Sequence, residues 1–416
     1  MSASAPRLAP RVVVSFIGTL VLAYLAANLV PVLIGALVND LGFTVAHAGN
    51  LVTLMSLGTA AGLFAANRFV ARGDRATVAR TGLAGMVIGF GSAAAVLTPS
   101  VVQVGVIIGG ISCGVVMAAG IASTAVTMNP DKTTTMVTIV NRAGAALLLA
   151  VVPLLGNDLQ HLLTVLALLG AGGLFAAGGL PNLPVQEKPT GRLRPFTPAA
   201  ILLAAVFGHW SLSEDMVYAM LEILAVQNVG LSPGQSSVVI SLQIIGGLTG
   251  AVVAPLVLAR IGRSLSIFGI LVLSSTAKFL IVSSTVAPVF LAANVAWGLA
   301  YGAALVLVLG LAARMDVSGR VGVLVSTIYI IGIALGPAVG GILVTYTSPL
   351  MFATMVSAVS VVAGLVLLMI SRRSGVPERG GDRLRVHDVA AGDPLATFPQ
   401  GQDATSTSGA ADRGSR

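Results

Sequence analysis

Four charged residues lie deep inside long apolar stretches of the sequence: Arg142, Glu214, Asp215 and Lys278. A charge at the centre of a membrane helix costs about 2.5–3.5 kcal/mol on insertion scales, so such residues usually face a cavity or an opposite charge. Arg142 stands beside Asn141, and its planar guanidinium suits a carboxylate or a phosphate. The sequence therefore predicts that Arg142 and Asn141 contact an anionic ligand, with a structural ion pair to another helix as the alternative.

Glu214 and Asp215 are adjacent carboxylates within one apolar stretch. Two neighbouring carboxylates in a low dielectric do not both ionise readily, so we expect at least one of them to carry a proton. This predicts a proton-coupling role for Glu214 or Asp215. The alternative is that both acids pair with Arg142 and Lys278 and only hold helices together.

Aromatic and polar residues recur at helical spacing around these charges. Trp210, Glu214 and Tyr218 follow i, i+4 and i+8, which places them on one helix face, with Asp215 about 100° away. Further candidates for a ligand cavity are Tyr24, Asn28, Asn294, Trp297 and Tyr301. The alternative for these stripes is ordinary helix packing. One Arg, several acids and several aromatics favour a small amphipathic organic ligand, an organic anion being one such class, over a bare ion or a sugar.

The stretches that hold these residues have the length and composition of membrane spans. The chain is 56% hydrophobic and 9% charged, with a mean hydropathy of +0.97. About 20 apolar residues cross a bilayer core, and no period-2 strand pattern is present, so the spans are predicted to be helices. The twelve predicted spans are residues 12–38, 45–69, 81–97, 101–127, 133–155, 159–180, 198–226, 236–258, 265–286, 289–313, 321–346 and 350–370.

The 23 Lys and Arg residues are distributed unevenly between the loops that connect these spans. All except Arg142 and Lys278 fall in alternate loops, at a span end or near the termini, which predicts a multi-pass protein of the cell (inner or plasma) membrane with both termini cytoplasmic. The net charge of +8 is spread over short loops that face lipid, so it does not indicate nucleic-acid binding. A single cysteine, Cys113, excludes a disulfide framework and a multi-cysteine metal site, and no cofactor motif is present.

Sliding the chain on itself by 188 residues superposes the first half on the second from the first to the fifth span. The basic turn 71–75 meets the turn Ala259-Arg260-Ile261-Gly262-Arg263, which places two arginines at equal spacing in each half. Small-residue pairs, Gly110/Gly114 and Gly298/Gly302, also coincide and permit close helix approach. Such an offset predicts parallel repeats of six helices.

At these residues the chain resembles the major facilitator superfamily of secondary transporters. The turn 259–263 matches the family's Asp-Arg-x-Gly-Arg signature except for the acid, which is Ala259 here; in the first copy Ala71 replaces the acid and Asp74 the glycine. The run 332–341 is similar to a Gly-Pro element that drug antiporters of the family carry in the fifth helix. Here the fifth span lacks that element, the fourth lacks the exporters' arginine, and the first lacks their acid.

The resemblance implies an all-α polytopic membrane protein of twelve helices in two six-helix bundles. The expected parts are a cytoplasmic N-terminus (1–11), a first bundle (12–181), a linker (182–197), a second bundle (198–370) and a disordered tail (371–416). In that fold the fifth helix lines a central cavity, which favours Arg142 as a ligand contact. The ninth helix is peripheral, so Lys278 is expected to form a structural pair with Asp215. The basic turns are expected to latch the cytoplasmic side through Arg72, Arg75, Arg260 and Arg263.

The function predicted on this basis is a secondary active transporter, working as a monomer, that moves a small organic solute by alternating access with proton coupling. The alternative in the same class is a proton-driven efflux antiporter for drugs or a secreted metabolite. A polytopic membrane enzyme or a sensor is the remote alternative, because no phosphate loop, metal-ligand cluster or nucleophile triad is present in the sequence.

Overall fold

The computed structural model describes residues 9–70, 74–156, 158–182, 195–316 and 320–373, and all regular elements within these ranges are helical. The first half contains α1 (Pro10–Phe16), the π-helical turn η1 (Ile17–Val21), α2 (Leu22–Asn28), α3 (Val30–Leu41), α4 (Val45–Val70), α5 (Arg75–Ala95), α6 (Pro99–Ala125), α7 (Pro130–Leu155), α8 (Leu159–Ala176) and the 3-10 turn η2 (Ala177–Gly179). The second half contains α9 (Pro198–Ala219), α10 (Leu221–Val229), α11 (Pro233–Ile261), α12 (Arg263–Ser283), α13 (Ala287–Met315), α14 (Arg320–Tyr346) and α15 (Pro349–Arg373).

Eleven helical segments of the described chain are long and apolar enough to cross a membrane. The remaining crossing is α9 with α10, and α9 is the helix that carries Glu214 and Asp215. The expected all-α architecture of twelve crossings is therefore confirmed. The boundaries of the two bundles stay a prediction, and most of the linker, most of the tail and Arg72 lie outside the described residues.

Two of the predicted spans are broken helices. The first is interrupted at Leu29 (φ −93°, ψ 3°) and the seventh at Met220 (φ −91°, ψ 2°), so both residues occupy the bridge region between helix and strand conformations. Pro31 has no N–H to donate to the preceding turn, which explains the first break. No glycine or proline marks the second break. These interruptions free backbone carbonyls in the middle of the molecule.

The local geometry repeats at the offset of 188 residues. Gly42 and Gly230 end α3 and α10 in the left-handed conformation, with φ of 65° and 70°, which a residue with a Cβ adopts at a cost. Arg75 and Arg263, at the same offset, begin α5 and α12, and both are buried. The repeat seen in the sequence is thus a repeat of turns and helix ends.

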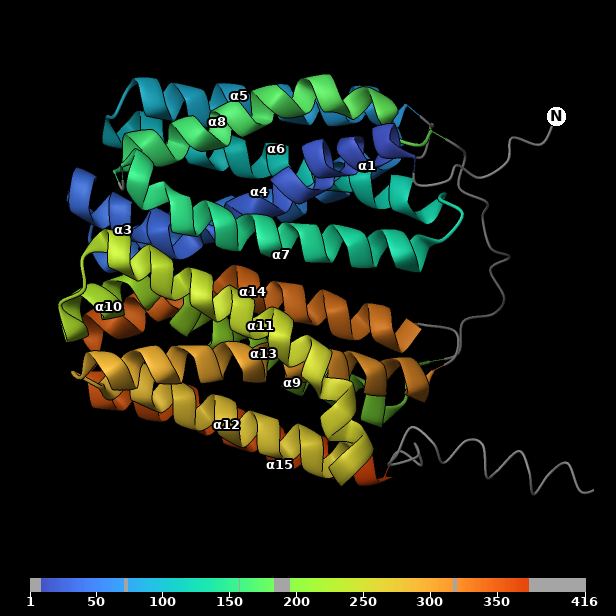
Figure 1. Ribbon diagram of the computed structural model, residues 1–416, viewed down its shortest axis with the longest axis vertical. Helices are drawn as coiled ribbons and strands as arrows, with labels where there is room; N and C mark the ends of the chain where they lie inside the picture. Colours follow the sequence, from blue (N-terminus) through green and yellow to red (C-terminus); the bar gives the residue numbers. More distant parts are fainter. Residues whose placement is uncertain (1–8, 71–73, 157, 183–194, 317–319, 374–416) are drawn as a thin grey trace, which may run out of the picture.

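The two halves pack against each other mainly through α4 with α14 and through α7 with α11. In Figure 1 the first half (blue to green) and the second half (yellow to red) lie one above the other, and α1 begins at the same end at which α15 finishes. Contacts between the halves lie toward the opposite end: Thr53 Oγ1 accepts the Ala338 N–H at 2.9 Å, and Ser241 Oγ donates to the Ala146 carbonyl at 2.7 Å. We call the end that carries the turns at Gly42 and Gly230 the closed end. The end at which α1 begins is called the open end.

Small residues bring helices together within each half. A Cβ on Gly110 or Gly114 of α6 would overlap the backbone of Met55 or Thr59 in α4. A Cβ on Gly302 of α13 would likewise overlap the Gly247 carbonyl in α11. The close approach expected from the small-residue pairs is therefore confirmed. In lipid such contact is a main source of attraction between helices, because burial of apolar surface contributes little there.

We predict that Gly302→Ala lowers the thermal unfolding midpoint of the detergent-solubilised protein by several degrees, because overpacking a close contact costs about 1–3 kcal/mol. The matched control is Gly322→Ala on α14, since a Cβ there meets no atom within 4 Å. Equal midpoints for the two variants would show that the backbones of α11 and α13 do not approach this closely.

Candidate functional site

A buried ion pair joins α9 to α12 in the second half. Lys278 Nζ lies 2.8 Å from Glu214 Oε1, and the two side chains are 0% and 2% exposed. The expected partner of Lys278 was Asp215, which is wrong. The register of α9 turns Glu214 toward α12, and the 100° step between adjacent helical residues then carries Asp215 to a different face.

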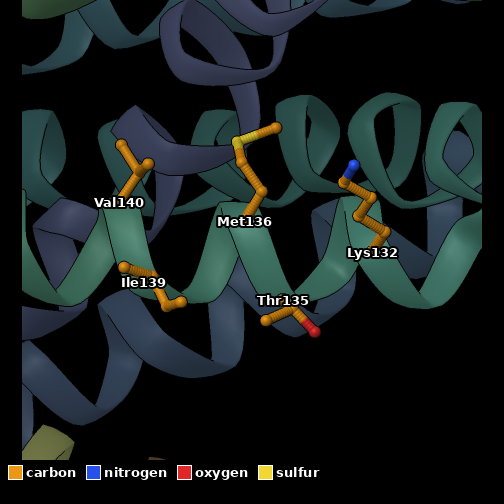
Figure 2. A pocket seen from close by; sticks show the side chains of 5 residues that line it. All are labelled: Lys132, Thr135, Met136, Ile139 and Val140. Carbon is orange, nitrogen blue, oxygen red and sulfur yellow. The ribbon is translucent and has the colours of Figure 1, made fainter. Parts of the chain in front are cut away.

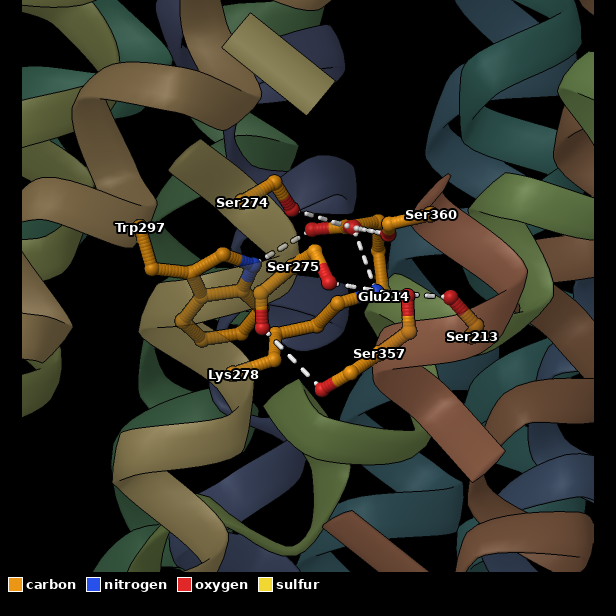
Figure 3. Close-up of polar contacts among 8 residues, drawn as sticks. All are labelled: Ser213, Glu214, Ser274, Ser275, Lys278, Trp297, Ser357 and Ser360. Atoms are coloured by element: carbon orange, nitrogen blue, oxygen red, sulfur yellow. Dashed lines mark hydrogen bonds and ion pairs between the residues drawn. The ribbon is translucent and has the colours of Figure 1, made fainter. Parts of the chain in front are cut away.

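Hydrogen bonds complete the surroundings of this pair, and Figure 3 shows them among side chains of α9, α12, α13 and α15. Ser274 Oγ donates to Glu214 Oε1 at 2.8 Å, the Trp297 indole N–H donates to Oε2, and Lys278 donates to Ser213 Oγ at 2.7 Å. Buried charges are tolerated when paired and hydrogen-bonded in this way. Glu214 is thus engaged in the packing of the second half.

Asp215 lies on another face of α9, against α14. A Cβ on Gly336 would overlap the Asp215 carboxylate, so the glycine leaves room for the acid. Asp215 is half-buried, and among the described residues it forms no hydrogen bond or ion pair. Of the two adjacent acids, only Asp215 has a carboxylate available to a proton or a ligand.

Arg142 projects from α7 toward the break in the first span. Its Nη1 lies 3.4 Å from Asn28 Oδ1, and Asn28 in turn donates to Asn141 Oδ1 at 3.2 Å. The Asn28 carbonyl, next to the break at Leu29, accepts the Tyr218 hydroxyl at 2.7 Å from the other half. Arg142 is half-buried, and no carboxylate among the described residues pairs with it. The site thus presents a guanidinium without a counter-ion.

Three half-buried tyrosines lie between the two unpaired charges. Tyr218, Tyr301 and Tyr329 each interact electrostatically with both Arg142 and Asp215. The Tyr301 and Tyr329 hydroxyls hydrogen-bond to each other, and the Arg142 guanidinium carbon lies 6.0 Å from the Tyr301 ring centroid. The site is therefore a set of phenol groups with a cation from the first half and an acid from the second.

The remaining predicted residues have other surroundings. Trp210 is fully buried and stacks on Tyr301, with ring centroids 5.8 Å apart; Trp297 is 1% exposed and bonds Glu214. Asn294 is buried and donates to the Val239 carbonyl at 2.7 Å, which holds α13 to α11. Tyr24 is half-buried, one turn before Asn28. Aromatic side chains of α9 and α13 thus contact each other, and their role in a ligand cavity stays a prediction.

A hollow of about 480 Å³ runs along α7 near its open end. Lys132, Thr135, Met136, Ile139 and Val140 line it, and Figure 2 shows them along that one helix. Arg142 follows Ile139 by three residues and so extends the same helical face. The hollow thus lies on the part of α7 that precedes Arg142, and Lys132 is its charged lining residue.

Three of the predicted latch arginines, Arg75, Arg260 and Arg263, lie within the described residues. Arg75 Nη1 donates to the Pro181 carbonyl at 3.0 Å, and its backbone N–H donates to Asn182 Oδ1 at 3.1 Å. Arg263 is 1% exposed, whereas Arg260 is exposed on α11. Their role in a second conformation stays a prediction.

Sequence reasoning missed Tyr329, Lys132 and the role of Tyr218 between the halves. Tyr329 has no aromatic neighbour at helical spacing in α14, so only its contact with Tyr301 identifies it. Tyr218 belonged to a recognised stripe, but its bond to the Asn28 carbonyl depends on the break at Leu29. Neither the contact of Tyr329 with Tyr301 nor that of Tyr218 with Asn28 can be recognised from the periodicity of the sequence.

Solved transporter structures have the same fold. The nucleoside transporter NupG is similar with a TM-score of 0.67 and 16% identity, covering 87% of this chain and 99% of that one. The peptide transporter POT in complex with sulfate is similar with a TM-score of 0.70 and 12% identity, covering 90% and 97%. The human organic anion transporter MFSD10 is similar with a TM-score of 0.60 and 17% identity, covering 86% and 99%.

The sequence itself matches no family model and no curated protein. At these identities the structural similarity establishes the fold, which is the one that the resemblance to the major facilitator superfamily implied. Substrate and coupling must be argued from the chain's own residues.

We predict that Lys278→Met strongly lowers the thermal unfolding midpoint, because it leaves a buried carboxylate unpaired at a cost of about 3–5 kcal/mol. The double variant Lys278→Met with Glu214→Gln should recover most of the loss, since the amide still accepts from Ser274. Unfolding in detergent measures both midpoints. A double variant as unstable as the single one would contradict the pairing.

Proposed function

We propose that this chain, which has the fold of major facilitator transporters, is a secondary active transporter that moves a small organic anion by alternating access and couples its movement to protons. Arg142 binds the anionic group of the solute, with Asn28, Asn141 and Tyr301 beside it. Asp215 carries the coupled proton.

The observation that supports the proposed anion transport most directly is the absence of an acidic partner for Arg142 among the described residues. A guanidinium at mid-helix depth is expensive without a counter-ion, yet no acid of the described chain pairs with it. A carboxylate or phosphate of a solute supplies that charge, and the guanidinium fork binds such groups through two parallel hydrogen bonds. The neighbouring Tyr301 ring and the Tyr218 and Tyr329 hydroxyls accommodate an organic body with polar substituents.

The shape of the molecule supports alternating access. The halves contact each other toward the closed end, and the hollow along α7 lies toward the end that carries Arg75, Lys132, Arg263 and Arg320. The excess of basic residues in these loops predicts that the open end faces the cytoplasm, so the structure corresponds to an inward-open state. Lys132, which lines the hollow, favours the approach of anions over cations.

Asp215 is the preferred proton carrier because Glu214 is already paired with Lys278. Its half-buried carboxylate lies on α9, next to the α14 glycine that leaves it room, and α14 contacts α4 of the first half. A change in its charge therefore acts at the contact between halves that must move. Gly332, Gly336 and Gly340 pack α14 on α9, and Gly341 packs it on α4, which accounts for that run without drug antiport.

We predict that Arg142→Ala lowers affinity for anionic solutes by about 10- to 100-fold, because hydrogen bonds to a charged group contribute about 1.5–3 kcal/mol. Binding of a panel of small carboxylates and their matched neutral amides to purified protein measures this. Arg372→Ala, an exposed arginine at the end of α15, is the control and should bind normally. An Arg142→Ala variant that still prefers the carboxylates would remove Arg142 from the site.

We predict that Asp215→Asn abolishes the response of solute accumulation to an imposed pH gradient while exchange of solute across the membrane continues. The amide keeps the size of the acid but cannot release a proton. Uptake into proteoliposomes with gradients of both signs measures the response.

The double variant Glu214→Gln with Lys278→Met is the matched control, because it removes the other intramembrane acid together with its partner. It should keep the pH response of the parent protein. The assignment to Asp215 fails if Asp215→Asn still concentrates solute when the gradient is applied.

A further inference from the structure

A third acid, Glu222, is buried where the two halves meet at the closed end. It lies in α10, two residues after the break at Met220, and is 2% exposed. A Cβ on Gly35 of α3 would overlap the Glu222 carboxyl group, so the acid packs directly on the backbone of the first half. The contact between α3 and α10 therefore encloses a carboxyl group.

Within the part of the chain that the structure describes, no group stabilises a negative charge on Glu222. Its Oε2 is buried without a hydrogen-bond partner, and the described residues form no ion pair with it. The charged group that acts on it from α3 is Asp40, which has the same sign and accepts the Leu159 N–H at 2.6 Å. Asp158 and His161, an exposed pair at the start of α8, are close to that contact.

Among the described residues, the other helices that pack on α10 place no unpaired cation beside Glu222. On α9, Glu214 and Asp215 lie about two turns earlier, and Lys278 of α12 is paired with Glu214. The charged residues of α11 and α13, Arg260 and Arg314, lie at the open end. A carboxylate enclosed in this way, beside a like charge, is unfavourable by several kcal/mol, and the group avoids that cost by holding a proton.

We propose that Glu222 is a proton-binding site at the closed end, and that the halves close there only when it is protonated. When α3 and α10 separate, water reaches the carboxyl group and it ionises; when it takes up a proton, the contact with Gly35 can form. This inference rests on the alternating-access part of the proposed function. It adds a site that receives its proton from the side opposite to the cytoplasm and is distinct from Asp215.

Spin-label distances without solute test this directly. Asn39→Cys on α3 and Gln227→Cys on α10 are exposed positions across the contact, and Ile139→Cys on α7 with Val323→Cys on α14 form a pair at the open end. In nanodiscs, raising the pH should lengthen the first distance and shorten the second. Glu222→Gln, a neutral group of the same size, should abolish both shifts and hold the closed-end distance short at every pH.

Two control variants identify the group responsible. Asp40→Asn should keep the transition and move it to lower pH, because removal of a like charge lets Glu222 ionise more readily, and Asp215→Asn should keep the closed-end transition. Glu222→Met, a second uncharged variant, should behave as Glu222→Gln does. The proposal is overturned if the parent distances do not change with pH, or if Glu222→Gln shows the parent transition.

Because no solute is present, these results do not depend on Arg142 or on what the protein transports. A failure of the carboxylate-binding experiment would leave the Glu222 result standing. Conversely, normal carboxylate binding with a pH-independent closed end would leave Arg142 in place and remove Glu222.

Discussion

A charge inside a low-dielectric protein interior needs an opposite charge, hydrogen-bond donors or a change of protonation, and this constraint organises the centre of the molecule. Glu214 and Lys278 satisfy it within the second half, through their ion pair and the surrounding Ser and Trp donors. Arg142, Asp215 and Glu222 have no such partner among the described residues. Under the proposed function, an anionic solute satisfies the first of these groups and protons satisfy the other two.

The same region joins the halves mechanically. The break at Leu29 frees the Asn28 carbonyl, which accepts the Tyr218 hydroxyl, while the Asn28 side chain contacts Arg142. Tyr218 also packs on Trp297, whose indole bonds Glu214. A contiguous set of contacts thus runs from the buried ion pair to the arginine, so movement between the halves alters the surroundings of both.

Much of the fold was predictable because its physical causes are local. Span length and the absence of charge are each properties of one segment. The offset of 188 residues paired Arg75 with Arg263, and both arginines begin a helix and are buried. The break at Met220 was not predictable, since no glycine or proline causes it. The partner of Lys278 was predicted wrongly, because Glu214 and Asp215 are neighbours in sequence but point 100° apart.

The sequence by itself determined that the chain crosses a membrane about twelve times, and that a few intramembrane charges are its informative residues. These properties follow from the composition and periodicity of single segments. Only the tertiary structure decided which charges are neutralised by the protein and which remain for a ligand or a proton. That outcome depends on helix rotation and on contacts between segments far apart in the sequence, such as Tyr218 with Asn28, which are 190 residues apart. The sequence of one segment does not encode which side of another segment will face it.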